Sequence, residues 1–364
     1  MLKNVYAVVM AGGKGERFWP QSRIARPKQF LNLLGDITMI ELTLDRLRPF
    51  LPVENILVIT NQEYTEALRK LLPFLPAENV IGEPCMRDTA PCAALGAGII
   101  RARGGDDAVM ILLPADHLIE RTCDFGSLLV DVATCACENP RWIYTIGVVP
   151  TEPATWYGYI RCGEEIKSAG ETRLFKSLGF REKPDSATAE TFLADGHYRW
   201  NCGIFLFQIQ ALQTEFKRQC PELSEMLEKT CEFEQSGELT GKLPDLYARQ
   251  KKLSIDYAVM ENALHVAVAE CRFDWDDIGS WTALRNHLTS DDNGNVATGL
   301  FVGLDSRNLI VSGKSDHLVA AIGVEDLVIV ETPDVTLICR TEQAQRIKEL
   351  LATFNLRPEL RQFL

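Results

Sequence analysis

The first 150 residues alternate short apolar runs with segments of helical spacing, and this alternation constrains the fold more than any other feature. Thr38 and Glu41 form a capping-box pattern, which predicts the start of one helix. Pro91 stands at an early position of another expected helix, where proline is favoured. Strands and helices in alternation predict a doubly wound α/β sheet, whose ligands bind at the carboxyl ends of the strands. The expected strands are residues 5–10, 56–60, 109–113 and 143–148.

The pattern changes after the polar, turn-rich segment 290–295. Short β-rich triplets then begin at Leu309, Leu318, Leu327 and Thr336, at nine-residue intervals. Regular short strands separated by turns predict a small β-helix-like unit, and a helix with one apolar face follows near Ile347. Residues 151–288 read as α+β insertions into the sheet domain. We therefore expect one domain over residues 1–289 and a second over residues 290–364.

The charge balance excludes some classes of partner. Lys and Arg number 38 against 50 Asp and Glu, which gives a net charge of −12. An acidic chain has no electrostatic reason to coat nucleic acid or an anionic membrane. No apolar stretch reaches the ~18 residues of a membrane span. The 11 cysteines are scattered, which is typical of reduced thiols in a cytoplasmic protein.

A glycine-rich loop follows the first expected strand and suits a phosphate ligand. Gly12, Gly13 and Gly15 let backbone N–H groups approach an anion, and the cations Arg17 and Lys28 follow closely. Two other phosphate motifs are excluded. Phe18 stands where a dinucleotide fingerprint needs its third glycine, and Asn308 stands where a P-loop ending in Gly313-Lys314-Ser315 needs its first. A tight turn with solvated charges is the weaker alternative to a triphosphate site.

Two aspartates are candidate metal ligands. Asp116 ends an apolar run at the carboxyl edge of a strand, and Asp277 lies close to a glycine in Trp275–Trp281. One or two carboxylates together with substrate phosphates form a typical Mg²⁺ site. Either aspartate alone would be read as an ordinary loop or capping residue.

Further motifs extend this pattern over most of the chain. Their order resembles that of the sugar-1-phosphate nucleotidyltransferases, and within them the mannose-1-phosphate guanylyltransferase family. The resemblance implies a Rossmann-like, doubly wound mixed sheet as a catalytic domain, followed by a β-helix-like domain that forms a homodimer. The matching segments are residues 12–20, 27–30, 87–91, 114–117, 180–184, 200–205, 256–261 and 275–281.

The resemblance also implies a role for each matching position. Arg17, Lys28, Asp116, Lys183 and Asp277 would be the catalytic residues, and Asp116 and Asp277 would bind Mg²⁺. Mannose 1-phosphate would be held by Gly158, Glu182, Lys183 and Asn201. GTP would be held by Ala11, Gly12, Gly13, Lys14, Gly15, Glu16, Arg17, Lys28, Glu83, Arg87, Asp88, Thr89 and Ala115.

The residues alone also allow structural interpretations. Glu182 and Lys183 could form a surface ion pair, Asn201 could cap a turn, and Gly158 could lie in an aromatic strand edge. Two departures from the family pattern matter: Asp88 replaces a common asparagine, and Cys202 replaces a serine, with Ile204 in place of methionine. A carboxylate at position 88 would repel a triphosphate unless it were paired, with Arg87 for instance.

The expected reaction is transfer of GMP from GTP to mannose 1-phosphate, giving GDP-mannose and pyrophosphate. One alternative keeps the reaction but uses another nucleoside triphosphate, or another hexose or heptose 1-phosphate. A second is a catalytically silent paralogue that binds sugar nucleotides and regulates a partner. The set Arg17, Lys28, Asp116 and Asp277 argues against the silent form. Phe18 argues against a nicotinamide dehydrogenase.

Overall fold

The computed structural model describes residues 2–364, apart from the side chains of residues 167–169. The chain forms two compact units. The sheet unit contains the residues up to Gly12, together with Leu44–Ala115 and Ile119–Trp275, and the coil unit contains Gly13–Thr43, Asp116–Leu118 and Asp276–Leu364. The segment that follows the first strand thus groups with the C-terminal residues, and a domain boundary at 289/290 stays a prediction.

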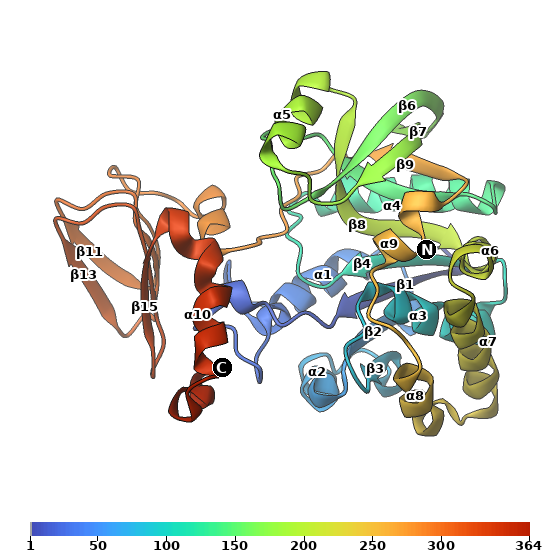
Figure 1. Ribbon diagram of the computed structural model, residues 1–364, viewed down its shortest axis with the longest axis horizontal. Helices are drawn as coiled ribbons and strands as arrows, with labels where there is room; N and C mark the ends of the chain where they lie inside the picture. The colour runs from blue at the N-terminus through green and yellow to red at the C-terminus, as the bar shows by residue number, and fades with distance from the viewer. Residues whose placement is uncertain (1) are drawn as a thin grey trace. The chain divides into compact units, whose positions relative to one another are not determined.

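A nine-stranded mixed sheet organises the sheet unit, in the order β3-β2-β1-β4-β8-β5-β9-β7-β6 (Figure 1). Strands β1 to β4 run parallel, whereas β8 pairs antiparallel with both β4 and β5. The four expected strands are confirmed to within one residue, because buried parallel strands read as continuous apolar runs. The strands are β1 (Val5–Ala11), β2 (Ile56–Asn61), β3 (Val80–Glu83), β4 (Val109–Pro114), β5 (Ile143–Val148), β6 (Gly158–Ala169), β7 (Thr172–Arg181), β8 (Tyr198–Gln208) and β9 (Val266–Glu270).

Helices bury both faces of the central strands. Val8 and Met110 face a core built with helices α3 and α6 to α9, and their neighbours Val9 and Ile111, which face the other way, are equally buried. Helix α4 packs against β4, β5 and β8. The predicted doubly wound mixed sheet is therefore confirmed. The helices are α1 (Met39–Leu47), α2 (Thr65–Leu71), α3 (Thr89–Gly104), α4 (Thr122–Glu138), α5 (Ser186–Asp195), α6 (Ile209–Gln219), α7 (Pro221–Ser236), α8 (Leu239–Ala248) and α9 (Ile255–Ala258).

Local sequence signals set where two of these helices begin. The Thr38 backbone N–H and hydroxyl both donate to Glu41 Oε2, at 2.8 and 2.6 Å, which confirms the predicted capping box. Helix α3 begins at Thr89, with Pro91 in its first turn as expected. In residues 2–364 no helix has the length and apolar character needed to cross a membrane.

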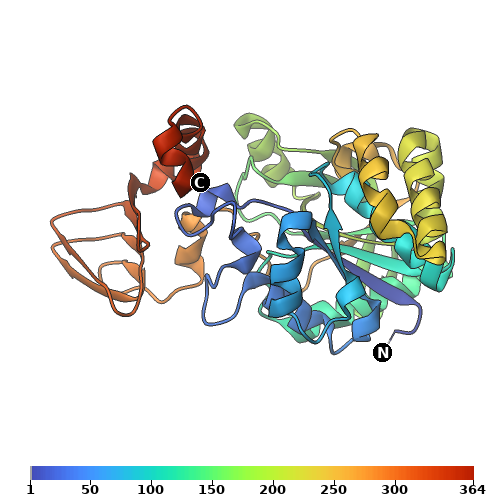
Figure 2. The same cartoon turned by 90° about the horizontal axis from the view of Figure 1, so that it is seen from below.

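Parallel strands of the coil unit stack into a β-helix-like coil, which confirms the predicted C-terminal fold (Figure 2, orange). Leu300 pairs with Leu318 and Ile310 with Val328, so that one turn of the coil takes two of the nine-residue intervals. The elements are β10 (Val296–Thr298), β11 (Leu300–Leu304), β12 (Ile310–Ser312), β13 (Leu318–Ile322), β14 (Leu327–Glu331), β15 (Thr336–Arg340) and helix α10 (Ile347–Phe354).

Short 3₁₀ helices complete the chain. Those of the coil unit are η1 (Glu16–Phe18), η2 (Lys28–Phe30), η7 (Trp281–Asn286), η8 (Thr341–Arg346) and η9 (Pro358–Phe363). Those of the sheet unit are η3 (Val53–Asn55), η4 (Gln62–Tyr64), η5 (Ala77–Asn79) and η6 (Met260–Asn262).

Aromatic side chains from distant segments form the core of the coil unit. Phe18 packs edge-on against Trp281 at 5.0 Å, and Trp19 against Phe354 at 5.4 Å between ring centroids. Trp281 Nε1 donates to the carbonyl of Trp19 at 3.1 Å, and Trp19 Nε1 donates to the carbonyl of Phe363 at 2.7 Å. The segment after the glycine loop is therefore built into this core.

Candidate active site

The glycine loop passes directly over Lys28. Gly15 has a φ of 63°, a left-handed conformation that glycine adopts without steric cost. A Cβ at Gly15 would lie 2.3 Å from Lys28 Cβ, so any larger residue would push loop and lysine apart. Arg17 follows in η1, and its Nε is buried with no hydrogen-bond partner among the described residues. A buried guanidinium N–H without an acceptor suits an anionic ligand.

Lys28 joins the two candidate metal-binding segments. Its ammonium donates to Asp116 Oδ2 at 2.9 Å, to the Asp116 carbonyl at 3.0 Å and to the Asp277 carbonyl at 2.6 Å. These bonds use all three of its N–H groups, and the side chain is only 8% exposed. The structure thus brings Lys28, Asp116 and Asp277 together as the sequence suggested. To reach the α-phosphate of a nucleotide, Lys28 would have to exchange one of these bonds.

The charge of Lys28 keeps Asp116 ionised. Burial alone would raise the pKa of Asp116, but the Lys28 ammonium, with His117, more than offsets this and holds the pKa below its ordinary value. An ionised carboxylate is a hard oxygen donor, and a second aspartate lies on the segment bound to the same lysine. This donor set fits Mg²⁺, which binds one or two carboxylates and takes its other ligands from phosphates and water.

A second cluster lies at the carboxyl ends of β1 and β3. Glu83 ends β3 and is buried, and Tyr247 Oη donates to its Oε1 at 2.8 Å. Burial raises the pKa of Glu83 to about 7, against the lowering effect of the tyrosine. The other oxygen, Oε2, would lie 3.4 Å from a Cβ on Gly12, so Glu83 and the start of the loop are neighbours. Tyr247 was not predicted, since 164 residues separate the pair.

The Arg87–Thr89 stretch leads into helix α3, and Asp88 has a structural role there. Its carboxylate accepts a hydrogen bond from Thr89 N at 2.9 Å and caps the helix, in a conformation with φ of 71°. Asparagine makes the same kind of cap, which explains how Asp88 replaces it. Thr89 Oγ1 accepts from Ile255 N at 2.8 Å. Arg87 Nε is buried without a partner among the described residues, like Arg17 Nε.

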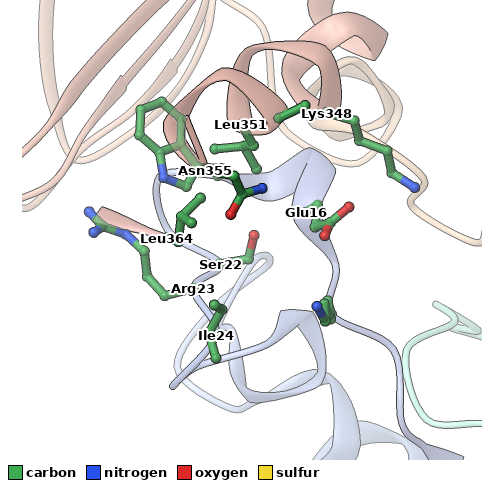
Figure 3. A pocket seen from close by; sticks show the side chains of 11 residues that line it. Glu16, Ser22, Arg23, Ile24, Lys348, Leu351, Asn355 and Leu364 are labelled. Carbon is green, nitrogen blue, oxygen red and sulfur yellow. The ribbon is translucent and has the colours of Figure 1, made fainter. Parts of the chain in front are cut away.

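The remaining nucleotide-binding candidates lie along or beside the loop. Ala11 ends β1, and Ala115 N donates to the carbonyl of Met10 at 3.0 Å, just before Asp116. Lys14 and Glu16 border a pocket of about 230 Å³ that is lined on its other side by residues of the C-terminal segment. Glu16 and Ser22 face Leu351 and Asn355 across this pocket (Figure 3). The Lys14 and Glu16 side chains therefore border a cavity that the sequence did not predict.

A third cluster gathers the candidate sugar-binding residues. Gly158 on β6 pairs in register with Asn201 on β8. A Cβ at Gly158 would lie 2.4 Å from Glu182 Oε2, so glycine is required for this close approach. Lys183, with a φ of 45°, pairs with Glu182 Oε1. The structure thus brings Gly158, Glu182 and Asn201 together, and the Glu182–Lys183 ion pair exists as well.

Asp256 also belongs to this cluster, although the motif at residues 256–261 implied no role for it. Its Oδ1 accepts from Asn201 Nδ2 at 2.8 Å, and burial followed by the charge of Glu182 raises its pKa to about 6. Asn201 Oδ1 in turn accepts from Gly203 N at 3.1 Å and from Thr145 Oγ1 at 3.3 Å. The amide of Asn201 is therefore held in one orientation. The acidic first residue of the 256–261 motif was the available signal.

Cys202 replaces serine without loss of a hydrogen-bond donor. Its thiol is buried and donates to the carbonyl of Ile146 at 3.2 Å. Burial raises the pKa of the Cys202 thiol, so the sulfur stays protonated. This departure from the family pattern keeps the interaction that a serine hydroxyl would make.

Comparisons with known proteins identify the family of the chain. The family model for nucleotidyl transferases matches residues 6–293, and the model for the mannose-phosphate isomerase/GMP-like β-helix domain matches residues 299–353. A mannose-1-phosphate guanylyltransferase of Klebsiella pneumoniae is 38% identical over 347 residues, which are 94% of this chain and 72% of that protein. An enzyme of the same name from Escherichia coli has the same identity and coverage.

A solved structure is similar over nearly the whole chain. The crystal structure of a protein from Thermus thermophilus, named mannose-1-phosphate geranyltransferase, has a TM-score of 0.84 and 35% identity. The match covers 97% of this chain and 100% of that one. The resemblance inferred from the motifs is thus confirmed. The chain belongs to the nucleotidyl transferase family, as an enzyme whose relatives are mannose-1-phosphate guanylyltransferases.

Proposed function

We propose that this enzyme transfers GMP from GTP to mannose 1-phosphate and releases pyrophosphate. The observation that carries the proposal is the position of Lys28, which lies beneath the glycine loop and binds the segments of both Asp116 and Asp277. A loop for phosphates next to two acidic segments suits phosphoryl chemistry. The names of the relatives support the choice of GTP and mannose 1-phosphate as substrates.

The reaction is an in-line displacement. A phosphate oxygen of mannose 1-phosphate forms a bond to the α-phosphorus of GTP, while the bond from that phosphorus to the bridging oxygen of pyrophosphate breaks. The attacking oxygen is already anionic, so no general base is needed, and the protein positions two anions that repel each other. Arg17 would neutralise the departing pyrophosphate with its unpaired Nε–H, and Lys28 would hold the acidic segments in register. Bound between Asp116 and Asp277, Mg²⁺ would supply charge neutralisation at the phosphates.

Glu83 is the residue proposed to recognise the guanine base. Guanine carries adjacent N1–H and N2–H donors, and an ionised carboxylate accepts from both. Tyr247 orients the Glu83 carboxyl through Oε1 and favours its ionised form. Arg87 and Thr89, at the start of α3, are the proposed contacts to the rest of the nucleoside.

The Gly158 cluster is the proposed sugar site. Glu182 and Asn201 offer acceptors and a donor to sugar hydroxyls, and Asp256 fixes the orientation of Asn201. The Lys183 ammonium is mostly exposed, with 60% of its side chain accessible, and it is the proposed contact to the sugar phosphate. Its ion pair with Glu182 would connect the residue that binds the sugar phosphate to the residue that binds the sugar hydroxyls.

A pyrophosphate-release assay tests the substrates. GTP, ATP, UTP and CTP are each combined with mannose, glucose, fucose and heptose 1-phosphates. We expect the highest kcat/KM for GTP with mannose 1-phosphate. Turnover of another pair, with none for GTP and mannose 1-phosphate, would favour the alternative substrates, and no turnover of any pair would favour a silent regulatory paralogue.

We also propose that the coil unit forms a homodimer interface. Strands β11 and β13 present three cross-strand pairs of exposed apolar side chains: Leu300 with Leu318, Val302 with Ala320, and Leu304 with Ile322. A contiguous apolar strand surface of this kind marks a protein interaction site. Leu304→Glu should convert a dimer to a monomer in sedimentation analysis, and an unchanged mass would contradict the proposal.

The expected compartment is the cytoplasm. Every cysteine in the described part of the chain is a free thiol, including the exposed Cys123 and Cys137. Exposed thiols persist in a reducing compartment, which supports this proposal.

A further inference from the structure

A backbone bridge sets the register of the two proposed metal-binding segments. Leu118 N donates to the Asp276 carbonyl at 2.8 Å, and Asp276 N donates to the Leu118 carbonyl at 3.1 Å. Asp116 lies two residues before one end of this bridge, and Asp277 directly follows the other. Whatever holds Asp276 in place therefore also fixes the backbone of Asp277.

Both oxygens of the Asp276 carboxylate are engaged. Oδ1 accepts from Ile278 N at 2.7 Å, and His287 Nε2 donates to Oδ2 at 2.8 Å. The Asp276 and His287 side chains are only 17% and 16% exposed, so water competes little for these bonds. The bond from Ile278 N to the Asp276 carboxylate therefore joins the two residues on either side of Asp277.

The backbone needs this support. Ile278 has a φ of 40°, a left-handed conformation that a β-branched residue rarely adopts. Such a conformation persists only where the surroundings impose it, and its Asp276 bond and complete burial do so here. Without that bond, the peptide on either side of Asp277 could relax to an ordinary conformation.

His287 is itself firmly held. It directly follows η7, and its N–H donates to the Leu284 carbonyl at 3.1 Å. At the other end of η7, Trp281 is completely buried against Phe18, next to Arg17 in the loop. The histidine therefore connects the Asp277 backbone to the same core that supports the glycine loop.

We propose that Asp276 and His287 are positioning residues, which orient Asp277 for a divalent cation through the Asp276 carboxylate. This inference rests on the proposed function, since it takes Asp277 as a metal ligand. Residues that orient metal ligands by hydrogen bonds change metal affinity by about 10- to 100-fold when they are removed. A merely structural pair would change the stability and leave the affinity of the folded protein unaltered.

The test measures Mn²⁺ binding to the full chain by electron paramagnetic resonance, with saturating GDP-mannose. His287→Leu removes the donor, and His287→Gln keeps an N–H at the reach of Nε2. We expect His287→Leu to weaken Mn²⁺ binding by about 10- to 100-fold and His287→Gln to stay within about 3-fold of the unaltered protein. His197→Leu is the matched control, because His197 Nδ1 contacts Asp195 Oδ1 at the same 2.8 Å distance on an exposed surface of the sheet unit.

The outcomes separate this inference from the function beneath it. Equal Mn²⁺ affinity in His287→Leu and the unaltered protein overturns the positioning role, provided that Asp277→Asn loses the ion. Mn²⁺ binding that survives Asp277→Asn overturns the metal assignment itself. If thermal unfolding shows that His287→Leu does not fold, His287→Asn replaces it, since that amide is too short to reach Asp276 Oδ2 and should weaken Mn²⁺ binding to a similar degree.

Discussion

Tyr247 donates its hydroxyl to Glu83 Oε1 at 2.8 Å, inside a region where both side chains are buried. The bond lowers the pKa of Glu83, but burial outweighs it and the value reaches about 7. Glu83 is therefore part protonated near neutral pH. Ionisation of Glu83, the proposed contact to the base, therefore lowers the stability of the folded protein.

Glu83→Gln should stabilise the protein at alkaline pH and weaken it as an enzyme. The folded pKa of Glu83, about 7, exceeds the ordinary 4.5, so the folded state holds a proton that the unfolded state releases between these values. Stability therefore falls as pH rises through that window, by at most about 3 kcal/mol. Glutamine does not titrate and still accepts from Tyr247, so urea unfolding should show the gain at pH 8 and little at pH 5. An equal effect at both pH values would contradict the assignment.

Lys28→Met should lower the stability of the fold and also reduce turnover. The change leaves the Asp116 carboxylate without its cation, and its pKa should rise. Breaking a buried pair costs about 3–5 kcal/mol, and we expect the lower end because 34% of the Asp116 side chain is exposed. Urea unfolding measures this loss. Adding Asp116→Asn should restore stability without restoring turnover, and a double variant no more stable than Lys28→Met would contradict the pairing.

Asp277→Asn should nearly abolish turnover while the fold stays intact. The change removes the charge of one proposed metal ligand and keeps its size. The loss of one contact at developing charge costs about 10²–10³ in rate, and we expect at least the upper figure. The measurement is kcat at saturating Mg²⁺, with circular dichroism as the check on folding. Near-normal activity under these conditions would refute the metal assignment.

Gly158→Ala should act on the sugar substrate alone. Its Cβ would lie 2.4 Å from Glu182 Oε2 and displace that carboxylate. We expect the KM for mannose 1-phosphate to rise about 10-fold, equivalent to ~1.4 kcal/mol, with the KM for GTP unchanged. Gly241→Ala is the control, since no atom lies within 4 Å of a Cβ there. Parallel rises in both KM values would argue against a separate sugar site.

Local signals in the sequence were sufficient for much of the fold. Buried strands such as β4 read as apolar runs, and the Thr38–Glu41 capping box marks the start of a helix through contacts only three residues apart. The nine-residue interval revealed the coil but not that each turn contains two strands. Pairing between strands depends on contacts that no local pattern encodes.

The candidate site was also only partly predictable from the sequence. The motifs identified Lys28, Asp116 and Asp277, but not that one ammonium would bind both acidic segments. The sequence predicted repulsion between an unpaired Asp88 carboxylate and a triphosphate, which stays a prediction, but it did not show that this carboxylate caps a helix. Tyr247 and Asp256 lie far along the chain from the residues they hold, and His287 lies 11 residues from Asp276 with η7 between them, so only the folded structure shows these contacts.

The aromatic core around Trp19 has a consequence for how this enzyme can be engineered. Trp281 and Phe363, which bond to Trp19, and Phe354, which packs against it, come from the last quarter of the sequence. A gene cut after residue 289 would remove two of these partners, Phe354 and Phe363, from the segment that follows the glycine loop. The C-terminal residues therefore cannot be removed without exposing Trp19. A truncated or chimeric version of this enzyme would have to keep them together with the N-terminal residues.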